Sequence, residues 1–561
     1  MRWLSATITV ALLLGTEATP SAANSFDPTK IDASFLTEIL SAPTDDFDVI
    51  VRSVPLDKEG RAGRAAERRV EKAAKSVTKQ GGSVKHVLGI VGGISARIKG
   101  VHILKLTRDD DVDYVVKDQK LRAQFDPALD SLKAGSPGIL EVDAPTAWSQ
   151  LGVTGRGVGV AVVDSGVYPH PDLAGRIVAA IDFTSVAPTV SNIPLNDLGG
   201  HGTHVAGLIA GDGTQSAGLY TGVAPNANII DVRVIDANGS SNVSIILRGL
   251  QWVLANRATY NIKVLNMSLG ATPTGSYKSD LMATAAEILN FAGVTVVVSA
   301  GNSGPLAGTI TTPATDPYVV TVGALDDNAT PLLADDLMAT FSSRGKTPFD
   351  RLAKPDLVAP GRRMISLRSP GSTLDSLFPD RQVTVPGSLS ADYYRLSGTS
   401  MAAPVVAGTI ALMYERNPTL SPAQIKKRLK STVTPLAFGT TLDRGAGLVN
   451  AYRAAESVDV GREYSPDRVS DAFAKDMKRF ILGQPFVWRD LTYNGGVDSS
   501  GMTWEGVTWE TVRWDAVTWE NVMWEGFTWE GVTWEGVTWE TLTWLSSGAL
   551  SGTGTTWDPV D

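Results

Sequence analysis

Residues 158–163 read VGVAVV and run directly into Asp164, and this apolar stretch decides the fold. Similar runs rich in valine and isoleucine follow at 229–235, 262–268, 294–300 and 319–324. Between and after them, apolar residues recur at helical spacing in 243–257, 280–292 and 403–415. Apolar strands that alternate with helices are typical of a parallel sheet covered by helices on both faces. We therefore predict an α/β domain over residues 137–455.

The composition of the whole chain fits a packed protein. Of its 561 residues, 43% are hydrophobic and 19% are charged, which is typical of a globular fold. Lys and Arg number 50 against 59 Asp and Glu, so the net charge is −9. The basic surface of a nucleic-acid-binding protein is missing, and we expect no nucleic-acid partner. The absence of cysteine excludes thiol catalysis, disulfides and cysteine-ligated metal sites.

The first 23 residues have the pattern of a secretory signal peptide. Arg2 precedes the apolar run at 4–15, and Ser21-Ala22-Ala23 offers a small-x-small cleavage site. A short membrane anchor is the alternative, but about 20 apolar residues are needed to cross a bilayer. This run is broken by Glu17 before it reaches that length. We expect export, with the protein extracellular or at the cell surface.

A small α+β unit is predicted between this leader and the α/β domain. Residues 24–46 are expected to be a linker, and 47–124 to form the unit itself. Strand patterns lie at 47–54, on both sides of Gly92-Gly93 within 86–99, and at 112–117; helix patterns lie at 62–80 and near 100–108. This βαββαβ order is typical of a ferredoxin-like fold.

The C-terminal part has a different pattern. We expect a linker at 456–500, a tryptophan-rich repeat at 501–545 and a tail at 546–561. The repeat has the form T-W-E-x-V with a period of five. Thr, Val and Trp favour strands, which predicts short β segments that coil as a solenoid. Two roles stay open for the tryptophans: packing inside the solenoid, or contact with sugars and a cell surface.

Three polar residues stand at the ends of predicted elements. Asp164 ends the first strand, at the edge where α/β proteins place ligands, although a strand-terminal Asp also serves as a turn or cap residue. His201 opens a helix in HGTHVAG, and His204 lies three positions later. Two histidines this close can bind zinc, but no cysteine or HExxH motif accompanies them. We therefore assign no metal. Ser400 begins a helix in GTSMAAP, where the helix N-terminus favours a negative oxygen and where serine is also a common N-cap.

These residue types together point to nucleophilic catalysis. A serine hydroxyl is too basic to attack alone, so an imidazole must take its proton and a carboxylate must orient the imidazole. Asn302, in the glycine-flanked turn SAGNSG, carries an amide donor that could stabilise an oxyanion together with the backbone N–H of Ser400. Taken alone, an asparagine in a tight turn is common.

The motifs VVDSG, HGTHVAG, NMSLG, SAGNSG and GTSMAAP, in that order, resemble those of the subtilisin family of serine peptidases (subtilases) over residues 137–455. The resemblance implies that Asp164 orients His201 and that His201 is general base and then general acid. It implies further that Ser400 is the nucleophile and that Asn302 binds the oxyanion. No organic cofactor is required for this chemistry.

The same resemblance implies how a substrate is bound. Ser268, Leu269 and Gly270 would pair with a substrate peptide as an added strand, and Ser299, Ala300 and Gly301 would line the pocket for the residue before the scissile bond. The substrates would be proteins or peptides.

The unit at 47–124 is similar to the subtilase propeptide, which assists folding and then inhibits by leaving its C-terminus in the cleft. The maturation cut is expected between about 118 and 136. We therefore predict a secreted serine endopeptidase made as a self-processing zymogen, with its own propeptide as inhibitor. Two alternatives are a surface-binding protein whose subtilase domain is only a scaffold, and an enzyme that cuts itself once.

Two segments depart from the family pattern. Residues 211–221 lack the Asn-containing loop that forms a strong calcium site in some relatives, so no calcium is assigned there and calcium elsewhere is left open. Residues 368–396 form a long segment before the nucleophile motif. This segment either shapes the cleft as a flap or is an inert surface excursion, because such loops carry specificity but also tolerate insertion.

Overall fold

The computed structural model describes residues 26–53, 62–123 and 138–458, with gaps at 186–187, 189, 192–194 and 331, and two strands at 518–520 and 538–540. The predicted signal peptide and residues 124–136 of the expected maturation region lie outside the described residues, as does most of the tryptophan-rich repeat. Among the helices in the described ranges, none is both long and apolar enough to span a membrane.

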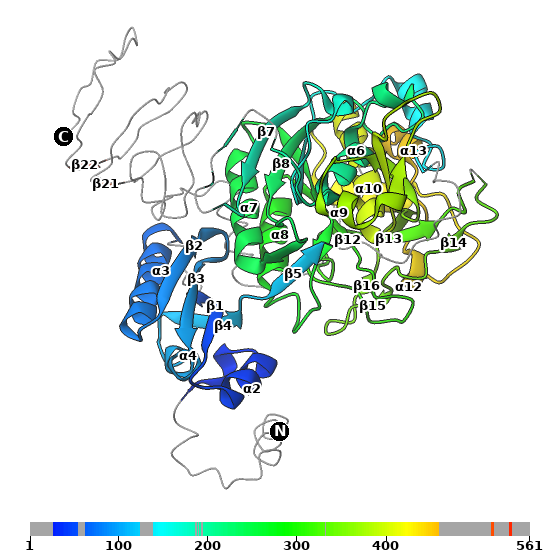
Figure 1. Cartoon of the computed structure of the whole chain (residues 1–561). Coiled ribbons are helices and arrows are strands. Elements are labelled where there is room, and N and C mark those ends of the chain that lie inside the picture. The colour runs from blue at the N-terminus through cyan, green and yellow to red at the C-terminus, as the bar shows by residue number, and fades with distance from the viewer. Residues whose placement is uncertain are drawn as a thin grey trace, which may run out of the picture.

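A mostly parallel sheet forms the centre of the large domain (Figure 1). Its strands run in the order β14-β13-β12-β10-β6-β8-β7, and β17 also pairs with β13. The strands are β6 (Gly159–Asp164), β7 (Ile177–Asp182), β8 (Asn228–Arg233), β10 (Ile262–Met267), β12 (Thr295–Ser299), β13 (Val320–Asp326), β14 (Leu337–Met338) and β17 (Leu357–Pro360). Within it, β14 pairs antiparallel with β13. The five strands predicted from the Val/Ile runs are confirmed, and β7, β14 and β17 are additional.

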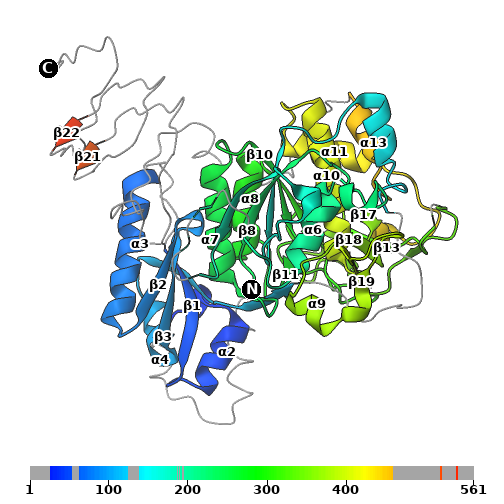
Figure 2. The same ribbon diagram turned by 45° about the horizontal axis from the view of Figure 1, so that its top comes forward.

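Helices cover both faces of this sheet (Figure 2). On one face lie α6 (His201–Ala210) and α10 (Thr399–Arg416), and on the other α7 (Val243–Asn256) and α8 (Leu281–Phe291). Side chains alternate across a strand, so β6 contributes Val160 and Val162 to one core cluster and Ala161 and Val163 to the other. Both faces of β6 are therefore buried, which explains why its sequence is apolar at every position.

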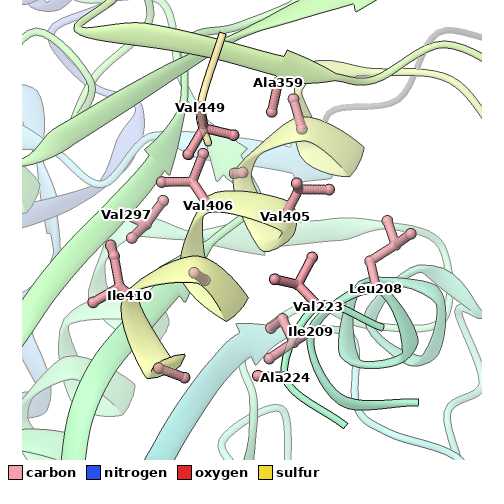
Figure 3. Packing of buried hydrophobic residues seen from close by; sticks show 14 of the residues in the cluster. Leu208, Ile209, Val223, Ala224, Val297, Ala359, Val405, Val406, Ile410 and Val449 are labelled. Atoms are coloured by element: carbon pink, nitrogen blue, oxygen red, sulfur yellow. The ribbon is translucent and has the colours of Figure 1, made fainter. Parts of the chain in front are cut away.

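Helix α10 passes through the middle of the hydrophobic core on the side of the sheet covered by α6 (Figure 3). Its residues Val405, Val406 and Ile410 pack among side chains from α6, β12, β17 and two loops, which include Leu208, Ile209, Val223, Ala224, Val297, Ala359 and Val449. Every residue of α10 from Thr399 to Tyr414 is buried. Truncating one large side chain in such a core typically costs about 2–5 kcal/mol of unfolding free energy. The helix that carries Ser400 is thus rigidly held.

The N-terminal region forms a second α+β unit with the predicted order of elements (Figure 1). Four antiparallel strands lie in the order β2-β3-β1-β4. The elements are β1 (Asp46–Ser53), α3 (Ala62–Lys79), β2 (Ser83–Leu88), β3 (Gly93–Lys99), α4 (Gly100–Leu106) and β4 (Val112–Lys117). A further strand, β5 (Lys120–Ala123), leaves this sheet and pairs with the large domain.

The predicted linker at 24–46 is folded where it is described, so that prediction is wrong. It contains α2 (Ala33–Ser41), and Asp32 caps this helix by accepting the N–H groups of Ser34 and Phe35. Phe35 and Ile39, four positions apart on one helix face, are buried in the core of the small unit. A linker has no apolar side chains to bury, and these two residues tie the segment to the sheet.

In the C-terminal repeat, β21 (Thr518–Glu520) pairs in parallel with β22 (Thr538–Glu540), with Trp519 opposite Trp539. The solenoid and the role of its tryptophans stay predictions.

Candidate active site

The predicted carboxylate and imidazole are in contact. Asp164 is the last residue of β6 and His201 is the first residue of α6. Oδ1 of Asp164 lies 2.8 Å from Nδ1 of His201, and both side chains are buried. An ionised carboxylate accepts the Nδ1–H, which leaves Nε2 as the ring nitrogen for proton transfer.

Asp197 holds the start of α6 in place, and the sequence analysis missed it. Its Oδ1 accepts the N–H groups of Gly199 and Gly200 at 3.1 and 2.8 Å and the hydroxyl of Ser165 at 2.9 Å. Its Oδ2 accepts the N–H and hydroxyl of Thr203 at 2.9 and 2.7 Å. This buried carboxylate therefore joins the end of β6 to the first turn of α6. An Asp shortly before a predicted helix is a capping signal that could have identified it.

The electrostatics of the pair predict a pH dependence. Burial lowers the pKa of His201, but the charge and hydrogen bond of Asp164 raise it by more, so its pKa lies above the ordinary value of 6.5. Only the neutral ring can accept a proton from serine. We therefore expect the acidic limb of a kcat/KM–pH profile to have its midpoint above 6.5.

Replacing Asp164 with Asn should lower that midpoint as well as the rate, because the attraction that raises the pKa of His201 is lost. An unchanged midpoint in Asp164→Asn would contradict this origin of the shift.

The same raised pKa determines how the contribution of the Asp164–His201 pair to folding stability depends on pH. The pair stabilises the fold below the unfolded-state pKa of His201, and this contribution is lost as the pH rises through the folded-state pKa.

Ser400 lies in the first turn of α10 and is fully buried. Its Oγ lies 3.0 Å from the main-chain oxygen of Ser268, and the hydroxyl of Ser268 donates to the main-chain oxygen of Ser400 over 2.9 Å. These two contacts fix the predicted nucleophile beside the segment that is predicted to pair with substrate.

Asn302 places an amide donor next to the nucleophile. Its Oδ1 accepts the N–H and the hydroxyl of Thr399, each at 2.9 Å, so the orientation of the amide is set. Its Nδ2 is buried and has no hydrogen-bond partner among the described residues. Leaving a buried donor unpaired costs about 1–3 kcal/mol. Such a donor fits a site where an incoming oxygen completes the bond.

An extended segment already lies against the predicted substrate-binding strand. β5 pairs antiparallel with β11 (Leu269–Gly270) on one edge and with β9 (Ser240–Asn242) on the other. Ala123 lies opposite Leu269, and its N–H donates to the main-chain oxygen of Gly239 over 3.0 Å. This is the pairing expected for a substrate peptide, made here by the chain itself. Nothing in the sequence analysis pointed to β9.

The predicted pocket segment lies beside the residue before the nucleophile. Ser299 ends β12, and Ser299 and Ala300 are fully buried. The N–H of Gly301 donates to the hydroxyl of Thr399 over 3.2 Å. Gly301 has a φ of +111°, and a Cβ there would lie 2.8 Å from Oγ of Ser343, so only glycine fits. The role of these residues as a pocket lining stays a prediction.

The long segment at 368–396 contacts the loop that precedes His201. It contains α9 (Thr373–Leu377), and the N–H groups of Thr373 and Leu374 donate to the main-chain oxygens of Leu198 and Gly199 at 2.8 and 3.2 Å. A Cβ on Gly200 would lie 2.4 Å from Oγ of Ser372. The segment therefore packs directly on the loop that leads into His201. These contacts favour the interpretation that the segment shapes the cleft, and both interpretations stay predictions.

His204 has a structural role. Its Nε2 lies 3.1 Å from the main-chain oxygen of Met364 and 3.0 Å from that of Tyr394, so the ring ties α6 to two strands, β18 (Met364–Leu367) and β20 (Tyr393–Leu396). Burial lowers the pKa of His204 to about 3, which keeps the ring neutral.

Comparisons with known proteins agree with this arrangement. Residues 155–449, more than half of the chain, match the sequence model of the Subtilase family, and this range includes Asp164, His201, Asn302 and Ser400. The chain is 42% identical over 304 residues to "Serine protease AprX" of Bacillus subtilis (strain 168), which covers 53% of this chain and 66% of that protein. It is 35% identical over 383 residues to "Subtilisin E" of the same strain, which covers 68% of this chain and 85% of that protein.

A solved structure shares the fold. The crystal structure of fervidolysin from Fervidobacterium pennivorans, described as a keratinolytic enzyme related to subtilisin, aligns with a TM-score of 0.56 at 25% sequence identity. The alignment covers 74% of this chain and 61% of fervidolysin. The family model, the two relatives and this fold agree: the chain belongs to the subtilase family, whose members are serine endopeptidases.

Proposed function

We propose that this chain hydrolyses peptide bonds of protein substrates through an acyl-enzyme at Ser400. The observation that carries the proposal is the 2.8 Å contact between the buried Asp164 carboxylate and Nδ1 of His201. Nε2 of His201 accepts the proton of the Ser400 hydroxyl as its oxygen attacks the carbonyl carbon. The tetrahedral oxyanion accepts hydrogen bonds from Nδ2 of Asn302 and the N–H of Ser400.

The proton on His201 then passes to the leaving amine, and the acyl group stays on Ser400. Water attacks this ester with His201 again as base, which releases the acid product and restores the hydroxyl. The test is casein hydrolysis by the purified chain, with and without a covalent serine-directed inhibitor. We expect turnover that the inhibitor abolishes. If protein freed of its N-terminal unit does not hydrolyse casein, the two alternatives are favoured instead: a surface-binding protein whose subtilase domain is only a scaffold, or an enzyme that cuts itself once.

We infer further that the N-terminal unit is an inhibitory propeptide. Its contacts with the large domain support this: Asp118 accepts the N–H and hydroxyl of Ser244, in the first turn of α7, at 2.9 and 2.6 Å. The N–H of Ile90 donates to Oε1 of Gln251 on the same helix over 3.1 Å. With the unit docked in this way, β5 fills the groove that a substrate peptide would use.

The register of β5 narrows the expected cleavage region. Ala123, the last residue of β5, lies opposite Leu269, the neighbour of Ser268. The main-chain oxygen of Ser268 is 3.0 Å from Oγ of Ser400. The maturation cut is therefore expected after Ala123, in the part of the predicted region 118–136 that follows β5. Mass spectrometry of the mature protein should show an N-terminus between residues 124 and 137, and a mature N-terminus upstream of residue 120 would contradict this register.

We also propose that the protein is secreted, on the signal-peptide pattern of residues 1–23. Attachment of the mature protein to cells or insoluble glycan, measured with and without residues 497–561, decides whether the tryptophan-rich repeat contacts a surface.

A further inference from the structure

Arg233 is a buried cation beside Asp164 that has no part in the proposed proton transfers. It is the last residue of β8, which lies next to β7 in the central sheet (Figure 1), and the parallel pairing of β8 with β6 places it opposite Asp164. Only 9% of Arg233 is exposed. Removing a guanidinium from water is costly unless its N–H groups are paired, so the contacts of Arg233 indicate what it holds.

The guanidinium of Arg233 donates to three acceptors, and two of them are main-chain oxygens in loops at the active site. Its Nε donates to the oxygen of Ser165, directly after β6, over 3.0 Å. Its Nη2 donates to the oxygen of Asn196, in the loop before α6. Its Nη1 donates to Oδ2 of Asp182 over 2.9 Å, and this carboxylate supplies the counter-charge. One planar side chain therefore joins the loop after β6, the loop before α6 and the end of β7.

The segment after Asp164 packs tightly against both this guanidinium and the first turn of α6. Gly166 has a φ of +113°, and a Cβ there would lie 2.7 Å from Nε and Nη2 of Arg233. A Cβ on Gly202, the residue after His201, would clash with the main-chain oxygen of Gly166. A displacement of the segment would therefore be transmitted to the turn that carries His201.

The strand that carries Arg233 gives these loops a fixed support. β8 pairs with β6 and β7, and a second side chain on it, Asp231, accepts the N–H of Val167 at Oδ2 over 3.1 Å. The hydrogen bonds of Asp197 join the two loops to each other, whereas Arg233 joins both loops to the sheet. Functional groups supported by rigid strands are held more precisely than groups supported by loops alone.

We propose that Arg233 is a positioning residue for peptide-bond hydrolysis, which fixes the relative placement of Asp164 and His201 by holding the adjacent loops against the sheet. The inference rests on the roles proposed for that pair. Arg233 acts through main-chain oxygens and moves no proton. Its planar guanidinium offers donors in a rigid fork, which the single ammonium of lysine does not.

The experiment compares Arg233→Met and Arg233→Lys with the parent, each expressed as the full chain, by steady-state kinetics on a peptide amide. Active sites are counted with a covalent serine-directed inhibitor, so that misfolded molecules do not enter kcat. Arg233→Met should lower kcat by about 10–100-fold and change KM by less than about threefold, because the pair is displaced while the substrate-binding strand is kept. Arg233→Lys should recover only part of kcat, because one ammonium cannot reproduce the three-way fork.

Asp182→Asn is the matched control. It removes the counter-charge of Arg233 but keeps both main-chain contacts of the guanidinium. The Asp182 side chain is 23% exposed, so water can reach the remaining N–H. We expect kcat to stay within about twofold of the parent, as for the loss of a partly exposed ion pair. Equal losses of kcat in Asp182→Asn and Arg233→Met would overturn the proposal, because the ion pair and not the loop contacts would then be responsible.

A second measurement does not depend on turnover. The Nδ1 proton of His201, held by Asp164, is strongly deshielded in ¹H NMR and can be recorded in chains that also carry Ser400→Ala. Arg233→Met should shift or broaden this signal while the protein stays folded, and Asp182→Asn should leave it unchanged. If Arg233→Met does not fold, Arg233→Lys is judged by the same two measurements.

These two measurements separate the inference from the proposed function. An unchanged signal or an unchanged kcat in a folded Arg233 variant overturns the positioning role. A fall in kcat/KM that comes from KM alone also overturns it, because Arg233 would then support substrate binding. A parent that shows the signal but hydrolyses no peptide would contradict the proposed function, and the signal alone would then decide the role of Arg233.

Discussion

Replacing Ser400 with alanine should lower kcat for casein hydrolysis by about 10⁶-fold, the scale measured when the nucleophile of a related enzyme is removed. The reason is that no other group can form the acyl-enzyme, although His201 and Asn302 keep their places. The variant should also keep its N-terminal unit attached, because the maturation cut after Ala123 would need the same hydroxyl. Both effects are measured on one preparation, by casein hydrolysis and by the mass of the purified chain.

Ser268→Ala is the matched control for this substitution. It removes a hydroxyl that donates to the main-chain oxygen of Ser400 over 2.9 Å, but it leaves the nucleophile intact. A typical hydrogen bond contributes about 0.5–1.5 kcal/mol, so the rate should fall by about tenfold at most. A Ser400→Ala protein that still loses its N-terminal unit when pure would rule out self-processing.

Replacing Asn302 with alanine should lower kcat by about 10²–10³-fold with little change in KM, the scale measured for the corresponding donor of a subtilisin. The oxyanion forms only after Ser400 attacks, so the lost hydrogen bond acts on the transition state and not on substrate binding. Steady-state kinetics on a peptide substrate separates kcat from KM. An increase in KM alone would assign Asn302 to substrate binding.

The control for Asn302 is Thr399→Val. This change removes the hydroxyl that donates to Oδ1 of Asn302 but keeps the N–H of residue 399, which donates to the same oxygen. The amide therefore stays in place with one of its two anchors. We expect a fall in kcat well below that of Asn302→Ala. Equal losses would mean that the effect of Asn302 comes from its hold on Thr399.

The sequence predicted the parts of this protein that depend on local pattern. The run at 158–163 predicted a buried strand because both of its faces contact helices, and the structure confirms this. Asp164 and His201 were predicted to come together from the ends of their elements, and their side chains are 2.8 Å apart.

Features that depend on pairing between distant segments could not be predicted in the same way. β9 consists of Ser-Ser-Asn, which has no strand signal of its own and is extended only because β5 lies beside it. The segment at 24–46 was misjudged for another reason: its helix is short, and Phe35 and Ile39 alone give a weak period.

The burial of α10 has a consequence for how this protein would lose activity. Ser400 sits on a helix that is enclosed from Thr399 to Tyr414, so the nucleophile cannot shift without opening the interior. A small displacement of Ser400 that abolishes activity while the rest of the domain stays folded is therefore not expected. Inactivation by heat should follow the cooperative melting of the whole domain, with no earlier stage in which the protein is folded but inert.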